Sequence, residues 1–238
     1  MTASWEEIWE RRAPSAAPSS TLMSLMKLDG LDTGYGSVTE DNWVAGVREA
    51  ARRLSLTPGE SVFEVGCGSG AFLYDLYRQG FEVAGLDRSA TLVGHARQAM
   101  PEGQFIQSDA AHLDIRESYD AVLSFSVFLY FPSHSYARQV IEAMVHKARR
   151  AVAILDIPDV AKKTAAMARR IETVGGEEAY ARRYAGLDHQ YYDRTWVAQV
   201  LIDCGLADVQ VADQWIDGYA NSEFRFNAWG FRADGDQS

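Results

Sequence analysis

The sequence predicts an α/β protein built on one doubly wound, mostly parallel β-sheet. Three observations predict this fold class. Apolar, strand-like runs alternate with amphipathic helical segments from about residue 56 onward, a glycine-rich turn follows the first strand, and a short turn joins the last two strands. Repeated strand–helix–strand units form a parallel sheet with helices on both faces. A chain of 238 residues, 47% of them hydrophobic, is long enough to bury such a core.

Seven strands are predicted from short apolar runs bounded by turn residues. The last two are separated only by DGYANS, and a parallel pair needs a long crossover. They therefore cannot both run parallel to the rest, and we expect a closing antiparallel hairpin. The predicted strands are 61–65 (SVFEV), 82–86 (EVAGL), 104–107 (QFIQ), 119–125 (YDAVLSF), 150–157 (RAVAILDI), 208–216 (DVQVADQWI) and 223–231 (EFRFNAWGF).

Helices are predicted where apolar residues recur every three or four positions. The helix after the glycines is expected to stop at Gly80, and Ser89 is expected to cap the next one, which ends at Pro101. A short amphipathic segment carries Trp5, Ile8 and Trp9. The other predicted helices are 39–54, 135–148 and 193–204.

We expect a single structural domain with two accessory parts. Residues 1–55 are predicted to form an N-terminal helical segment, and residues 56–238 the core. Within that core, residues 158–192 are predicted to form a helical insertion, because they carry no strand pattern.

Composition excludes several classes of function. The net charge of −10 and the pI near 5.0 argue against a nucleic-acid partner, which needs clustered Lys and Arg. The two cysteines have no metal-site or disulfide spacing, and no metal is expected. Neither a signal peptide nor a membrane span is predicted, so a cytoplasmic location is expected.

The stretch EVGCGSG, residues 64–70, points to a small-molecule ligand. Glycines in a strand-to-helix turn let a ligand approach the backbone, and the helix N-terminus attracts anions. A P-loop is excluded because no Gly-Lys-Ser/Thr follows. A dinucleotide site stays open, since Gly66, Gly68 and Ala71 satisfy G-x-G-x-x-A and Asp87 ends the next strand.

Two further features favour a different cofactor. Glu64 lies inside an apolar strand two residues before the first glycine, where a ligand with a cationic amine and a sulfonium would need an acid. QSDAAHLD follows the third strand at the ligand-binding edge of the sheet. With the closing hairpin, these motifs make residues 55–231 resemble the class I S-adenosylmethionine-dependent methyltransferases of the small-molecule branch. The resemblance implies a Rossmann-like sheet of order 3-2-1-4-5-7-6, with the last strand antiparallel. It also implies that residues 1–55 form a lid over the binding core, residues 56–238, and that the insertion 158–192 lies on the substrate side.

The resemblance also implies a role for each matching residue. The three glycines would wrap the methionine part of the cofactor, and Glu64 would act through the loop or on the amine. The acid after the second strand would bind the ribose hydroxyls, and the backbone at the end of the fourth strand would meet the amine. Glu64 and Asp109 can also be read as buried acids that cap loop amides. The implied cofactor-binding residues are Glu64, Gly66, Gly68, Gly70, Asp87, Arg88, Asp109, Ala110 and Ser124.

The acceptor side is less specific. His134 and His189 are the candidate catalytic residues, as a base or as orienting groups, with surface helix capping as the alternative. Aromatic residues gather outside the core, where they either contact the substrate or pack the accessory helices. The candidate substrate residues are Tyr35, Tyr130, Tyr191 and Tyr192.

These features predict an enzyme that moves a methyl group from S-adenosylmethionine to an O or N atom of a small molecule. S-adenosylhomocysteine would be the product. The absence of an Asn/Asp-Pro-Pro-Tyr/Phe motif and of a Pro-Cys nucleophile argues against methylation of nucleic-acid bases. Two alternatives remain at this point: an NAD(P)-dependent oxidoreductase, and an S-adenosylmethionine-binding module without catalysis.

Overall fold

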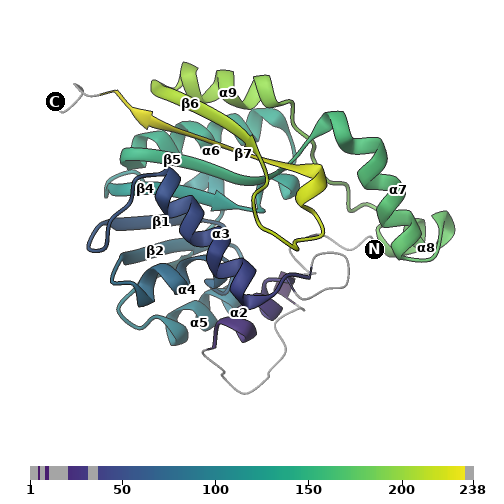
Figure 1. Ribbon diagram of the computed structural model, residues 1–238, viewed down its shortest axis with the longest axis horizontal. Coiled ribbons are helices and arrows are strands. Elements are labelled where there is room, and N and C mark those ends of the chain that lie inside the picture. The colour runs from purple at the N-terminus through teal and green to yellow at the C-terminus, as the bar shows by residue number, and fades with distance from the viewer. Residues whose placement is uncertain (1–4, 6–8, 11–20, 32–36, 234–238) are drawn as a thin grey trace.

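A seven-stranded sheet in the order β3-β2-β1-β4-β5-β7-β6 runs through the centre of the protein (Figure 1). The computed structural model describes residues 5, 9–10, 21–31 and 37–233. β7 is antiparallel to both its neighbours, and the other pairs are parallel, so the predicted fold class and strand order are confirmed. The strands are β1 (Ser61–Val65), β2 (Glu82–Asp87), β3 (Gln104–Gln107), β4 (Tyr119–Phe125), β5 (Ala148–Pro158), β6 (Leu206–Asp213) and β7 (Arg225–Arg232).

Helices cover both faces of the sheet, which is why β1 is buried at all five positions. Its Val62 packs into the core shared with α2, α3, α4 and α5, whereas Phe63 packs into the core on the opposite face with α6 and α9. The helices are α2 (Leu22–Leu28), α3 (Glu40–Arg53), α4 (Ala71–Arg78), α5 (Ala90–Ala99), α6 (His134–Lys147), α7 (Lys163–Thr173), α8 (Glu177–Arg183) and α9 (Arg194–Asp203).

Helix α2 was not among the predicted elements. Thr21 caps its N-terminus by accepting from the Ser24 amide, and Leu22, Leu25 and Met26 bury one face. A Thr at the cap position, followed by apolar residues at this spacing, is a pattern that predicts the start of a helix. The helix matters for the site because it delivers Asp29 to the glycine turn.

The two predicted accessory segments contain helices α2 and α3, before β1, and helices α7 and α8, after β5. The helices α7 and α8 follow β5 and stand beside the sheet near the first described residues (Figure 1). Both α2 and α3 belong to the same hydrophobic core as the sheet. The division at residue 55 stays a prediction. Across the described ranges, no helix has the length and apolarity needed to cross a membrane.

The closing hairpin has a longer connection than the sequence predicted. β6 ends at Asp213 instead of 216, because Gln214 turns inward and bonds to Asp156 and Asn227. β7 begins at Arg225 instead of 223. The resulting linker, 214–224, reaches the same edge of the sheet as the glycine turn and contributes residues to the cavity described next.

Candidate active site

The glycine turn between β1 and α4 needs its glycines for conformational reasons. Gly66, Gly68 and Gly70 all have positive φ, between 53° and 89°. A Cβ added to Gly66 would overlap the side chain of Val127, and one added to Gly70 would overlap Met100. The turn is held to β2, since the Leu86 carbonyl accepts both the Gly66 and the Cys67 amide. The three predicted glycines therefore form one tight turn, of which Gly66 and Gly68 line a cavity.

Asp29 is a functional residue that sequence reasoning missed. It follows α2, and its carboxylate accepts from the Ser69 amide at 2.7 Å and the Ala71 amide at 3.2 Å, which caps the N-terminus of α4. Burial raises its pKa from 3.8 to about 7, against the effect of these hydrogen bonds. The chain thus places its own carboxylate where a helix N-terminus would otherwise attract an anion.

Glu64 lies inside β1 and is 2% exposed. One oxygen, Oε2, is buried and has no hydrogen-bond partner among the described residues. Burial raises the pKa of this carboxyl well above its usual value, and the charges of Asp29 and Asp87 raise it further. Because Glu64 also lines the cavity, a cationic group bound there would supply the missing partner. The alternative reading, a cap for loop amides, finds no support at Oε2.

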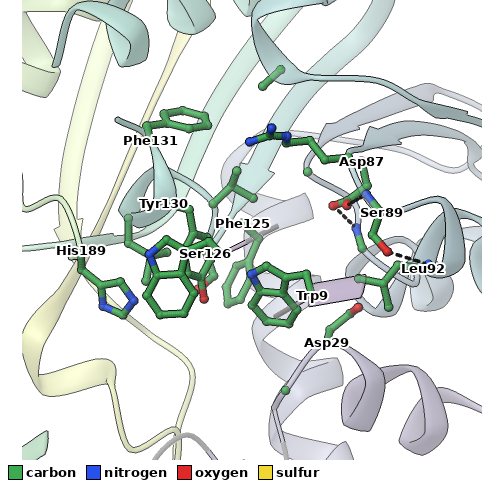
Figure 2. Close-up of a pocket in the computed structure, with 18 of the residues that line it drawn as sticks. Trp9, Asp29, Asp87, Ser89, Leu92, Phe125, Ser126, Tyr130, Phe131 and His189 are labelled. Carbon is green, nitrogen blue, oxygen red and sulfur yellow. Dashed lines mark hydrogen bonds between the residues drawn. The ribbon is translucent and has the colours of Figure 1, made fainter. Parts of the chain in front are cut away.

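Asp87 ends β2 and connects it to the glycine turn. Its two oxygens accept from the Gly68 amide at 3.0 Å and the Ser89 amide at 2.9 Å (Figure 2). Burial raises its pKa, although both hydrogen bonds oppose the shift. Each carboxylate oxygen can accept more than one hydrogen bond, so the carboxylate keeps capacity for hydroxyl donors in the cavity.

Asp109 and its neighbours form the far wall of the same region. The Asp109 carboxylate accepts from the Ala111 amide and from the Tyr136 hydroxyl, and it pairs with Arg88 at 3.3 Å. Burial alone would raise its pKa, but these partners lower it on balance. Asp109 caps the short helical turn Ala110–His112, as the alternative reading expected. The Arg88, Asp109 and Ala110 side chains all line the cavity.

Two serines mark the end of β4. Ser124 is fully buried, and its hydroxyl has no partner among the described residues. It does not line the cavity, but Ser126, two residues later, does. Ser126 has a φ of 55°, a conformation that L-residues other than Gly, Asn and Asp rarely adopt. The chain is therefore strained where it turns from β4 into the site.

The cavity has a volume of about 1160 Å³ and continues from the glycine turn to the helical insertion. Aromatic rings line its middle (Figure 2). The ring centroid of Trp5 lies 4.7 Å from that of His189, nearly parallel, and 4.9 Å from that of Tyr130. Trp9 packs edge-on against Tyr130. The N-terminal residues thus cover the middle of the cavity.

The N-terminal segment also contacts the other end of the cavity. Glu10 accepts from the Ala90 amide and the Thr91 hydroxyl, each at 2.9 Å, at the start of α5. At the acceptor end, the Trp5 indole donates to the Asp188 carbonyl at 3.2 Å. These contacts connect Trp5 and Glu10 to opposite ends of the cavity, and the role of residues 1–55 as a lid stays a prediction.

His189 is one of two candidate histidines and lines the cavity. Its Nδ1 accepts from the Arg170 guanidinium, which can only donate, so the neutral ring carries its proton on Nε2. Burial lowers its pKa to about 2, and the charges of Arg170 and Arg225 add to the shift. The ring is neutral at physiological pH and presents an N–H donor, which suits an orienting group better than a base.

The remaining predicted residues take different positions. His134 is exposed at the start of α6, packs against Tyr192 and Trp196, and does not line the cavity. Tyr192 is fully buried and donates to the Phe128 carbonyl at 2.8 Å. Tyr191 lines a small second cavity, and its buried hydroxyl is unpartnered within the described chain. Tyr35 lies outside the described residues.

Part of the chain is similar in sequence to known methyltransferases. Residues 62–154 match a family described as a methyltransferase domain. A trans-aconitate 2-methyltransferase of Rhodopseudomonas palustris is 29% identical over 98 residues, which is 40% of this chain and 38% of that protein. The chain thus matches well under half the length of this relative.

Solved structures share the fold. Magnesium protoporphyrin IX methyltransferase from Synechocystis, with bound S-adenosylmethionine, has a TM-score of 0.58 and 18% identity, over 92% of this chain and all of that one. The N-methyltransferase NodS from Bradyrhizobium japonicum, in complex with S-adenosylhomocysteine, has a TM-score of 0.62 and 16% identity, over 97% and 98% of the two chains. At such low identity these likenesses establish the architecture alone.

Proposed function

We infer that this chain, which belongs to the class I S-adenosylmethionine-dependent methyltransferases, transfers a methyl group to an O or N atom of a small molecule. The family membership agrees with the prediction from the sequence. The products would be the methylated acceptor and S-adenosylhomocysteine. The observation that carries the proposal is the buried Glu64 Oε2 beside the glycine turn, which has no partner among the described residues and lies in a cavity large enough for cofactor and acceptor together.

The acidic residues around the glycine turn fit the charge of this cofactor. When bound, S-adenosylmethionine supplies an electrophilic methyl group on a positively charged sulfur. We propose that Glu64 acts on the cationic end of the cofactor, and that Asp87 accepts from its ribose hydroxyls with the lone pairs not used by backbone amides. The three glycines leave space where any Cβ would collide with Val127, Asp29 or Met100.

The remaining cofactor residues take supporting positions in the proposal. Asp109, Arg88 and Ala110 would enclose the adenine, since they line the cavity beyond Asp87. The backbone near Ser124 would meet the amine of the cofactor, because β4 ends beside β1.

On the acceptor side, we propose that His189 orients the substrate. Its Nε2–H is buried, and no described residue accepts from it. Alignment of the two reactants supplies most of the rate in such a transfer, so an orienting donor contributes even where no base is present. Tyr130, Tyr191 and Tyr192 would shape the acceptor end, Tyr192 by supporting the turn at Phe128. His134 stays a prediction that the cavity does not favour.

The aromatic cover gives the proposed reaction a dry site. Trp5 stacks on His189, and both Trp5 and Trp9 pack edge-on against Tyr130. We propose that these rings exclude solvent from the middle of the cavity. Exclusion of water strengthens the electrostatic interactions inside the site and protects the reactive methyl group.

Calorimetry with the purified protein tests the proposal. We expect S-adenosylmethionine and S-adenosylhomocysteine to bind with one site per chain and NAD⁺ not to bind. Release of S-adenosylhomocysteine with a panel of small O–H and N–H acceptors would then establish turnover. Binding of NAD⁺ without binding of S-adenosylmethionine would overturn the proposal in favour of an oxidoreductase. Binding without turnover on any acceptor would leave a non-catalytic module.

A further inference from the structure

The end of the cavity opposite the glycine turn contains a buried arginine that the proposed reaction does not explain. Arg225 opens β7, is 4% exposed, and lines the cavity. Its Nη1 is buried and has no hydrogen-bond partner within the described part of the chain. Burial of a charged donor atom without an acceptor is costly, so the Nη1 of Arg225 favours an anion as its partner.

Asp156 is the acid whose charge most strongly raises the pKa of Arg225, but the two side chains form no direct ion pair. Its two oxygens accept instead from the side-chain amide of Gln214 at 3.2 Å and from the Tyr219 hydroxyl at 3.1 Å. If Arg225 served only to neutralise Asp156, a direct ion pair would be expected. The buried acid therefore lowers the energy of holding a positive charge here without occupying its donors.

Other unpartnered donors lie around Arg225. The His189 Nε2–H and the Tyr191 hydroxyl are both buried without partners among the described residues. Tyr191 does not line the main cavity, but it lines a small neighbouring one that shares Arg170 and Arg225 with it. Arginine can only donate, and the contact with Arg170 makes His189 a donor as well. A site made almost entirely of donors fits the oxygens of a carboxylate or phosphate.

The charges that line the cavity are divided between its two ends. The acids come from the end of α2 and the ends of β1, β2 and β3, and the cations come from the insertion and β7. The exceptions are Arg88, which pairs with an acid, and Asp188, which is exposed, as is Arg183 at the basic end. The residues concerned are Asp29, Glu64, Asp87 and Asp109 at the acidic end, and Arg170, Arg183 and Arg225 at the basic end.

We propose that the acceptor is an anionic small molecule whose carboxylate or phosphate group is bound by Arg225, His189 and Tyr191. The acidic end of the cavity then takes the cationic cofactor, and the basic end takes the anionic acceptor. This inference rests on the proposed methyltransferase function and specifies its substrate class. The opposite charges thus determine which end of the cavity each molecule occupies.

The inference can be tested without knowing the natural acceptor. The protein is first saturated with S-adenosylhomocysteine and then titrated with benzoate, phenyl phosphate and benzamide. The ring suits the aromatic lining, and benzamide is a neutral counterpart of benzoate with nearly the same shape. We expect one of the two anions to bind at least tenfold more tightly than benzamide, and the stronger one identifies the carboxylate or the phosphate as the recognised group.

Variants connect the preference to these residues. Arg225→Met should abolish it, whereas Arg225→Lys, which keeps the charge, should retain it in weakened form. Tyr191→Phe removes a hydroxyl that has no partner, so the free protein should stay as stable while anion affinity falls about tenfold. Arg182→Met is the matched control, because Arg182 is exposed on α8, pairs with Glu178 and does not line the cavity.

The outcomes separate the two proposals. Equal binding of benzoate, phenyl phosphate and benzamide would overturn the anion site and leave methyl transfer standing. An anion preference that survives in both Arg225→Met and Tyr191→Phe would also overturn it. If Arg225→Met does not fold, Arg225→Lys and Tyr191→Phe carry the test. Failure of S-adenosylhomocysteine to bind would instead overturn the proposed function, whatever the anions do.

Discussion

Replacement of Asp29 by Asn should remove much of the pH dependence of the stability of the cofactor-free protein between pH 5 and pH 8. The Asp29 carboxyl has a pKa of about 7 in the folded chain and 3.8 as an ordinary side chain. The native state therefore binds this proton more tightly than the unfolded state does. The stabilisation is fully present below about pH 4 and is lost as the pH rises through about 7.

The size of the effect follows from the two pKa values. One pKa unit corresponds to about 1.4 kcal/mol, so a difference of about 3 units gives an upper limit of about 4 kcal/mol. Asp29 is partly open to the cavity, where solvent screens its charge, and we expect about half of this value, ~2 kcal/mol. In a chain of this size that corresponds to a change in Tm of roughly 4–8 °C.

The assay is urea and thermal denaturation at pH 5, 6, 7 and 8. Asp29→Asn should lose one of the two contacts that cap α4, a loss of about 1 kcal/mol that is the same at every pH. The difference between wild type and variant should therefore change steadily with pH, in favour of the variant at pH 8. Glu102→Gln, at an exposed position, is the control. Parallel stability curves for wild type and Asp29→Asn would refute the reasoning.

Three other substitutions test the cofactor end. Asp87→Ala should weaken S-adenosylmethionine binding at least tenfold, about 1.4 kcal/mol, and unchanged affinity in calorimetry would refute the ribose assignment. Glu64→Gln should lower the affinity for S-adenosylmethionine and for S-adenosylhomocysteine severalfold, because both carry the amine, and paired titrations would reveal the loss. Gly66→Ala should destabilise the fold by about 3 kcal/mol, because it adds a clash with Val127 to an unfavourable φ. Gly80→Ala, with open space around a similar φ, should lose only about 1 kcal/mol, and equal urea midpoints would contradict the clash.

The order of strands and helices in the core was predictable because local patterns determine it. β1, β3 and β4 occupy the ranges expected from their apolar runs. Ser89 caps α5 as predicted, since a side-chain cap is a contact between near neighbours in the chain. The extent of the closing hairpin was not predictable, because Gln214 ends β6 through contacts with β5 and β7 that are distant in sequence.

The candidate site likewise contains residues that local patterns predict and residues whose positions depend on contacts distant in sequence. Residues that follow a strand directly, such as Asp87, could be placed from the pattern of the sheet. Asp29 and Arg225 could not, because their positions depend on how α2 and the linker 214–224 fold back onto the sheet. In the sequence, Arg225 is one polar residue in an alternating strand pattern, which ordinarily predicts an exposed side chain. It is buried because residues of β5, α7 and the linker 214–224 surround it.

The tryptophans that line the cavity make intrinsic fluorescence a probe of the site. Of the six tryptophans in the chain, Trp5, Trp9 and Trp43 line the cavity. A molecule that enters or leaves the cavity changes the surroundings of these indoles, among them Trp5, which stacks on His189. Intrinsic tryptophan emission should therefore follow occupancy of the site in real time, without a label and before any acceptor has been identified.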